Sequence, residues 1–197
     1  GRCIFCNICW IDNIFKSENF DLIIHLAAQA IVPRAFTNPY ETFSSNTLGT
    51  INLLEAWKNS SDSTDFICVT SDKVYQNNNN GKLFTENDVL GGTDIYSVSK
   101  SSCEFIVRAY ANNHCDLNGR YIHTLRLGNV VGGGDWSVNR LIPDLIKSYS
   151  TDKNFYLRYP KATRPFQHVL DVSMSIIELK NKMKNKILKN YDFWNIG

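Results

Sequence analysis

The sequence predicts an α/β fold in which helices cover both faces of a mainly parallel sheet. Strand-like and helix-like segments alternate along the chain, and this is the pattern that generates parallel sheets through crossover helices. The chain has 197 residues, which is enough to bury one sizeable core without metals or disulfides. Its longest apolar runs, such as residues 21–28, fall far below the roughly 20 residues of a membrane helix.

The individual elements follow from the spacing of apolar residues. Asp21–Leu26 is a short apolar run ending in small residues, which predicts a buried parallel strand. Over residues 39–58 apolar side chains recur at helical spacing, which predicts a crossover helix. Further strands are predicted at 65–70 and 121–129, further helices at 95–112, 141–149 and 172–189, and irregular segments at 130–136 and 156–166.

Charge and cysteine content narrow the class of protein. Lysine and arginine total 21 against 19 aspartate and glutamate residues, so nothing favours nucleic acid or an anionic membrane as partner. The six cysteines occur without a visible secretory signal, so we expect thiols and a cytoplasmic protein. Cys3, Cys6 and Cys9 have the spacing of zinc and iron–sulfur sites, but no fourth ligand follows at a matching distance. We therefore expect no metal, and favour buried or idle thiols.

Three predicted strands end in residues suited to a binding site. These ends are Ala27–Gln29, Thr70–Lys73 and Gly128–Asn129. In an open parallel sheet, ligands bind beyond the carboxyl ends of the strands. The sequence therefore predicts a ligand crevice where these three segments meet.

Two groups of residues in this region could carry acid–base chemistry. Tyr96 and Lys100 are four residues apart, which places them on one face of a helix, where the ammonium would favour the phenolate and lower its pKa. Such spacing also arises by chance in solvated surface pairs. Ser71, Asp72 and Lys73 offer a hydroxyl, a carboxyl and an amine in succession, although Ser and Asp also commonly form simple turns.

The motifs taken together resemble the extended short-chain dehydrogenases, the NAD-dependent epimerase and dehydratase family. The matching segments, in order and spacing, are His25–Gln29, Asn46–Ala56, Thr70–Tyr75 and Tyr96–Lys100. Within that family, residues 91–96, 128–136, 140–143 and 162–170 most resemble the CDP-glucose 4,6-dehydratases. The resemblance runs from about Asp21 to Gly197.

This resemblance implies a partial Rossmann-like, doubly wound parallel sheet with part of a small substrate domain. Residues 1–130 would form a partial NAD-binding domain, and 131–197 a partial substrate-binding region in which 168–190 packs back on the first domain. No Gly-x-x-Gly-x-x-Gly turn occurs in the sequence, although that turn normally brings the cofactor pyrophosphate to a helix amino terminus. We therefore expect the chain to be a fragment that lacks both ends and is inactive and poorly stable alone. The resemblance implies that the full-length protein is a homodimer.

The resemblance also implies the chemistry. Tyr96, held by Lys100, would take the proton of the sugar C4 hydroxyl while hydride passes to NAD+; water would leave across C5 and C6, and hydride would return to C6. Ser71 would hydrogen-bond the C4 oxygen, and Asp72 would protonate the departing C6 hydroxyl. Lys73 stands where many dehydratases have the glutamate that acts as the C5 base. The CDP-glucose branch also has lysine here, so the identity of the C5 base stays open.

The remaining site residues are also implied by the resemblance. NAD would be lined by small and polar residues at the strand ends, and the sugar nucleotide by an amide and two arginines, whose planar fork matches phosphate oxygens. His168 and Trp136 are interpreted as structural. The predicted cofactor residues are Ala27, Ala28, Gln29, Asn46, Thr70, Tyr96 and Lys100, and the predicted substrate residues are Asn129, Arg140 and Arg164.

Two other functions stay open. One is a 4-epimerase or a dehydratase acting on another nucleoside diphosphate sugar, because the Tyr-x-x-x-Lys pair serves all of them. An epimerase needs no acid and base after Ser71, so Asp72 and Lys73 argue against it. The other is a noncatalytic sugar-nucleotide-binding remnant, which the intact Tyr96 and Lys100 disfavour.

Overall fold

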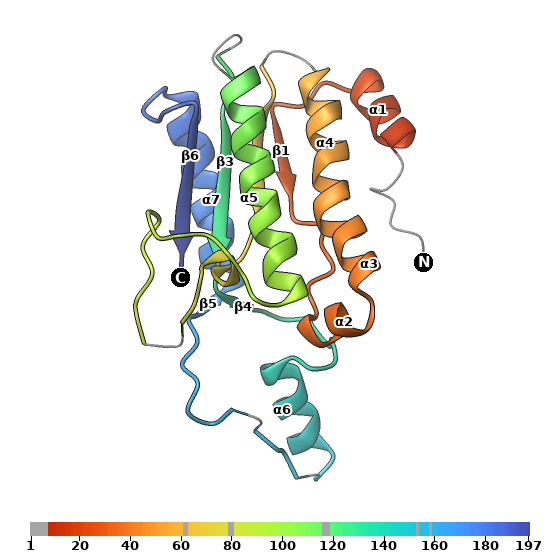
Figure 1. Cartoon of the computed structure of the whole chain (residues 1–197), viewed down its shortest axis with the longest axis vertical. Coiled ribbons are helices and arrows are strands. Elements are labelled where there is room, and N and C mark those ends of the chain that lie inside the picture. Colours follow the sequence, from red (N-terminus) through yellow and green to blue (C-terminus); the bar gives the residue numbers. More distant parts are fainter. Residues whose placement is uncertain (1–7, 61–62, 79–80, 116–118, 153, 158) are drawn as a thin grey trace.

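A four-stranded parallel sheet forms the centre of the protein (Figure 1). The structure is a computed structural model that describes residues 8–60, 63–78, 81–115, 119–152, 154–157 and 159–197. The strands lie in the order β1-β2-β3-β6. Their bounds are Leu22–His25, Asp65–Val69, Ile122–Leu127 and Tyr191–Ile196. The predicted parallel α/β sheet is confirmed.

Helices cover both faces of this sheet. Helices α1 (Ile8–Ser17), α4 (Gly49–Lys58) and α5 (Ile95–His114) lie on one face, and α7 (Val169–Lys184) lies on the other (Figure 1). Strand β2 shows why two cores form. Phe66 and Cys68 pack toward α4 and α5, whereas the alternate residues Ile67 and Val69 pack against α7. A strand buried on both faces is apolar throughout.

The helix predicted over residues 39–58 is continuous but changes its pitch. It consists of α3 (Pro39–Phe43), a π-helical turn η2 (Ser44–Leu48) and α4. The widened turn carries Asn46, which is buried. Such π turns are frequent at functional sites. A short preceding helix, α2 (Val32–Thr37), was not predicted, and a proline stands in its first turn.

The C-terminal region differs most from the prediction. Residues 129–131 form strand β4, which pairs in parallel with β5 (Phe166–His168), so the prediction of an irregular segment directly after Asn129 is wrong. Helix α6 (Leu141–Ser150) lies beyond the carboxyl edge of the main sheet (Figure 1). Helix α7 begins at Val169 because the His168 imidazole accepts a hydrogen bond from the backbone N–H of Leu170. Strand β6 was missed entirely.

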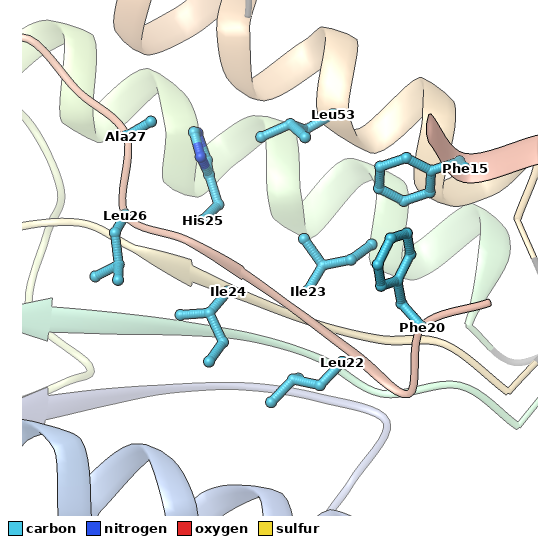
Figure 2. A pocket seen from close by; sticks show the side chains of 9 residues that line it. All are labelled: Phe15, Phe20, Leu22, Ile23, Ile24, His25, Leu26, Ala27 and Leu53. Carbon is cyan, nitrogen blue, oxygen red and sulfur yellow. The ribbon is translucent and has the colours of Figure 1, made fainter. Parts of the chain in front are cut away.

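Strand β1 is an edge strand, which corrects the expectation of a buried strand. In the described part of the chain it pairs only with β2, and Ile24 is 40% exposed. A groove of about 320 Å³ follows this edge. Figure 2 shows Ile23 and His25 pointing toward α4 and α5, with Leu22 and Ile24 on the opposite side. The lining is apolar apart from His25, so the groove itself holds no set of reacting groups.

The described ranges contain neither a membrane-spanning helix nor a cluster of metal-ligating side chains. No helix of the described ranges is both long and apolar enough to cross a bilayer. Nor do three metal-ligating side chains gather anywhere in the same ranges. Cys3 and Cys6 lie outside the described residues, as does the Cys9 side chain. Cys68, Cys103 and Cys115 are buried cysteines.

Candidate functional site

Helix α5 places Tyr96 and Lys100 against the end of strand β2. The helix begins where the Asp94 carboxylate accepts a hydrogen bond from the Ser97 backbone N–H at 3.0 Å, which is the usual role of an N-cap aspartate. Tyr96 and Lys100 are only 7% and 6% exposed. Lys100 Nζ donates to the backbone oxygen of Val69 at 3.0 Å. These contacts show a buried, fixed pair rather than the solvated surface pair that the spacing also allowed.

The segment after β2 is a tight turn packed beside α5. Ser71 caps the 3₁₀ turn η3 (Asp72–Val74): its Oγ accepts from the Lys73 backbone N–H at 3.3 Å and donates to Asp72 Oδ1 at 3.1 Å. Ser101 Oγ of α5 donates to the Val74 carbonyl at 3.0 Å. The structure therefore brings the two predicted groups of reacting residues together at one strand end.

The loop after β1 is held by amide contacts. Asn46 Oδ1 accepts from the Gln29 backbone N–H at 2.7 Å, and Asn46 Nδ2 donates to Ser99 Oγ at 2.9 Å. Gln29 Nε2 donates to Thr42 Oγ1 at 2.9 Å. Both amides thus fasten the loop to the helix layer instead of facing solvent. Ala27 and Ala28 stay partly exposed beside them, and the predicted cofactor role of the four residues stays a prediction.

His25 is a buried neutral group at the same strand end. Its Nε2 lies 3.0 Å from Thr50 Oγ1. Burial, followed by the positive charge of Lys100, lowers the pKa of His25 from 6.5 to about 4. The imidazole therefore stays uncharged at neutral pH.

Protonation of His25 predicts acid sensitivity of the fold. Above pH 6.5 the histidine is neutral in both states; as pH falls below 6.5, the unfolded chain takes up a proton that folded His25 refuses until about pH 4. The free energy of unfolding should therefore drop by about 2 kcal/mol between pH 6.5 and 5 from this residue. Urea denaturation should show a flatter pH profile for His25→Gln. A pH profile of His25→Gln as steep as that of the wild type would contradict the assignment.

A second pocket holds the three predicted substrate residues. It has a volume of about 430 Å³ and lies among β4, α6 and residues 155–166. Asn129, Arg140 and Arg164 all line it, and Arg140 Nε is buried without a hydrogen-bond partner among the described residues. Neither Tyr96 nor the Ser71–Lys73 turn is among its lining residues. The structure thus groups the predicted residues into a reacting cluster and a separate arginine-lined pocket.

Several aromatic residues of this pocket were not predicted. Tyr156 and Tyr159 line it, and so does Trp136, which was interpreted as structural and is 58% exposed. The density of aromatic residues at 155–159 was a signal that could have found two of them. By contrast, His168 does have a structural role, as the N-cap of α7.

Gly128 lies between the end of β3 and the start of β4, at a point where Pro165 approaches the backbone closely. A Cβ built there would lie 2.8 Å from the Pro165 carbonyl oxygen, which accepts a hydrogen bond from the Asn129 backbone N–H at 2.8 Å. Gly128→Ala should therefore cost about 2 kcal/mol of stability through overpacking. Urea denaturation measures this loss. Gly133→Ala is the matched control because nothing lies within 4 Å of its Cβ position; equal losses in both variants would refute the steric argument.

Comparison with known proteins places the chain among nucleotide-sugar enzymes. Residues 5–196 match the family model described as GDP-mannose 4,6 dehydratase. CDP-glucose 4,6-dehydratase of Salmonella typhimurium LT2 is 35% identical over 188 residues, covering 93% of this chain and 52% of that protein. dTDP-D-glucose 4,6-dehydratase of Dictyostelium discoideum is 29% identical over 196 residues, covering 93% and 44%. The chain therefore spans about half the length of these relatives.

A solved structure confirms the fold. RMD from Pseudomonas aeruginosa, complexed with NADPH, superimposes with a TM-score of 0.81 at 24% identity, covering 100% of this chain and 66% of that one. The Rossmann-like parallel sheet predicted from the motifs is thereby confirmed.

Proposed function

Because the chain belongs to the GDP-mannose 4,6 dehydratase family, we propose that its full-length gene product is an NAD-dependent sugar-nucleotide 4,6-dehydratase that acts on CDP-glucose. One observation carries the proposal: α5, with Tyr96 and Lys100, is fastened beside the turn that holds Ser71, Asp72 and Lys73. The relative with 35% identity supports the choice of CDP-glucose among nucleoside diphosphate sugars.

The residues divide the chemistry among them. Tyr96 takes the proton of the C4 hydroxyl, and Lys100, fixed at the Val69 carbonyl, supplies the positive charge that stabilises the phenolate. Ser71 hydrogen-bonds the C4 oxygen. Asp72, which is only partly buried, protonates the C6 hydroxyl as water leaves. Lys73 is the candidate for removing the C5 proton.

The residues present fit the nicotinamide half of the cofactor. Small residues, Ala27 and Ala28, stand partly exposed at the end of β1, where a Cβ-sized side chain leaves room for a planar ring. When bound, NAD+ accepts hydride from C4 and returns it to C6. MoeE5, solved with UDP-glucose and NAD, shares the fold with a TM-score of 0.77 at 23% identity, covering 95% of this chain and 59% of that one. Asn46 and Gln29 hold the loop that carries the two alanines.

The arginine-lined pocket suits the nucleotide. Arg140 and Arg164 present guanidinium groups to a concave surface, and guanidinium groups match pyrophosphate oxygens well. Asn129, at the start of β4, adds an amide to the pocket lining. The aromatic residues there offer faces against which a base can stack.

We also infer a homodimer in the cytoplasm. Helices α4 and α5 lie side by side (Figure 1), joined by a hydrogen bond from Tyr110 to Glu55. Apolar residues of this helix layer, Leu48 and Phe105, are 50% and 45% exposed, as expected for a layer that pairs with a second copy. The buried thiols of Cys68 and Cys103 suit a reducing compartment. Sedimentation equilibrium of the full-length protein tests the dimer.

The proposal is tested by incubating the full-length gene product with NAD+ and either CDP-glucose or dTDP-glucose. The 4-keto product is followed by its ultraviolet absorbance in alkali. Product from CDP-glucose supports the proposal, and product from dTDP-glucose alone would change the substrate. Bound sugar nucleotide without product would favour a 4-epimerase or a binding remnant.

A further inference from the structure

A fully buried ion pair lies directly behind the reacting turn. Arg126 Nη2 of β3 is 2.9 Å from Glu104 Oε2 of α5, and the two side chains are 3% and 1% exposed. Glu104 stands four residues after Lys100 and eight after Tyr96, so the three side chains project from the same side of α5. The ion pair is therefore built on the helix face that carries the proposed catalytic pair.

The carboxylate of Glu104 holds the chain just before Ser71. Thr70 Oγ1 donates to Glu104 Oε1 at 2.5 Å, and Thr124 Oγ1 donates to Glu104 Oε2 at 2.9 Å. Thr70 is only 4% exposed, with its hydroxyl turned to this carboxylate. Together with the Lys100 contact to Val69, this bond ties α5 to two consecutive residues at the end of β2.

The guanidinium of Arg126 holds the chain just after the same turn. Its Nη1 donates to Tyr75 Oη at 2.8 Å and to the Glu86 carbonyl at 2.9 Å. Its charge also lies over the rings of Tyr75 and Phe193, at 5.1 and 4.6 Å from their centroids. Tyr75 follows η3 directly. One ion pair thus contacts both residues that flank the segment 71–74.

Burying two charges is costly, and apolar residues of similar volume often stabilise a core as well or better. We propose that Glu104 and Arg126 are positioning residues: their ion pair sets the register of Ser71, Asp72 and Lys73 against Tyr96 and Lys100. This inference rests on the proposed function and adds two residues to it. If these residues set the register, removing the Thr70 hydroxyl displaces the turn, whereas removing the Thr124 hydroxyl from the same carboxylate does not.

Two threonines make a matched experiment possible. Thr70→Val and Thr124→Val each remove one buried hydroxyl that donates to the Glu104 carboxylate, with almost no change of volume. Of the two threonines, only Thr70 is adjacent to Ser71 in the chain. Both variants of the full-length gene product are assayed for kcat, for KM of CDP-glucose and NAD+, for melting temperature, and for amide hydrogen exchange in a peptide covering residues 71–75.

The positioning role predicts different outcomes for the two variants. Thr70→Val should lower kcat about 10- to 100-fold with little change in either KM, as expected when reacting groups are misplaced by about 1 Å. Exchange in residues 71–75 should become about tenfold faster. Thr124→Val should lower the melting temperature similarly but leave kcat within about threefold and exchange in 71–75 unchanged.

Three results would overturn the inference. Equal losses of kcat in both variants would show that only stability matters. A rise confined to the KM for NAD+ in Thr70→Val would make Thr70 a cofactor contact, and unchanged exchange at residues 71–75 would show that the contact of Thr70 with the Glu104 carboxylate does not hold the turn. If the wild-type protein makes no 4-keto sugar at all, the proposed function fails. The exchange comparison still decides whether the pair holds the turn.

Discussion

Tyr96→Phe is expected to lower kcat for CDP-glucose by about 10³-fold, because it removes the hydroxyl that we propose takes the proton of the C4 hydroxyl. The phenyl ring fills the same space, and the tyrosine is 7% exposed, so the fold should be retained. Binding of CDP-glucose should also persist, since the arginine-lined pocket does not include Tyr96. The 4-keto product and calorimetric binding measure the two properties separately.

Tyr110→Phe is the matched control for this experiment. Tyr110 lies on the same helix near its other end, where its hydroxyl bonds Glu55 rather than facing the strand ends. This variant should keep kcat within about twofold of wild type, as is usual for groups outside the reacting cluster. If Tyr96→Phe retained more than a tenth of the activity, proton transfer by Tyr96 would be excluded.

Glu104→Gln should cause the largest loss of stability, about 3–5 kcal/mol of unfolding free energy. The glutamine leaves Arg126 buried without a counter-charge. Burial acts to lower the pKa of Arg126, but the hydrogen bond and the charge of Glu104 outweigh burial and raise it. That support is lost in the variant, but an arginine side chain does not give up its proton in proteins, so the guanidinium stays charged and uncompensated. Urea denaturation at constant pH measures the loss.

Two comparisons show whether the loss comes from the stranded charge. Glu178→Gln breaks an exposed pair with Lys182 on α7, at 3.5 Å, and should cost less than about 1 kcal/mol. The double variant Glu104→Leu with Arg126→Met removes both charges and should recover much of the stability lost in Glu104→Gln. A double variant as unstable as the single one would attribute the loss to packing instead.

The sequence by itself was enough to predict the sheet and most of its helices. Alternating apolar runs predicted β1, β2, β3 and the helices that follow them, because a strand buried on both faces must be apolar and a helix covering it must be amphipathic. The chain order and spacing of the motifs placed Ser71–Lys73 and Tyr96–Lys100 at one strand end. The reason is that the carboxyl ends of parallel strands lie along the same edge of the sheet. Strand β6 escaped because its alternating polar and aromatic residues carry no continuous apolar run.

Only the tertiary structure decided which polar groups are held by other groups of the protein. Asn46 and Thr70 are both polar residues that the resemblance implies for the cofactor site, and the structure shows their side chains bonded to Gln29 and to Glu104. The Glu104–Arg126 pair joins a helix to a strand 22 residues away, and no local pattern specifies such a contact. Periodicity reports which side of an element is buried, whereas the partner of a buried charge depends on packing between distant elements.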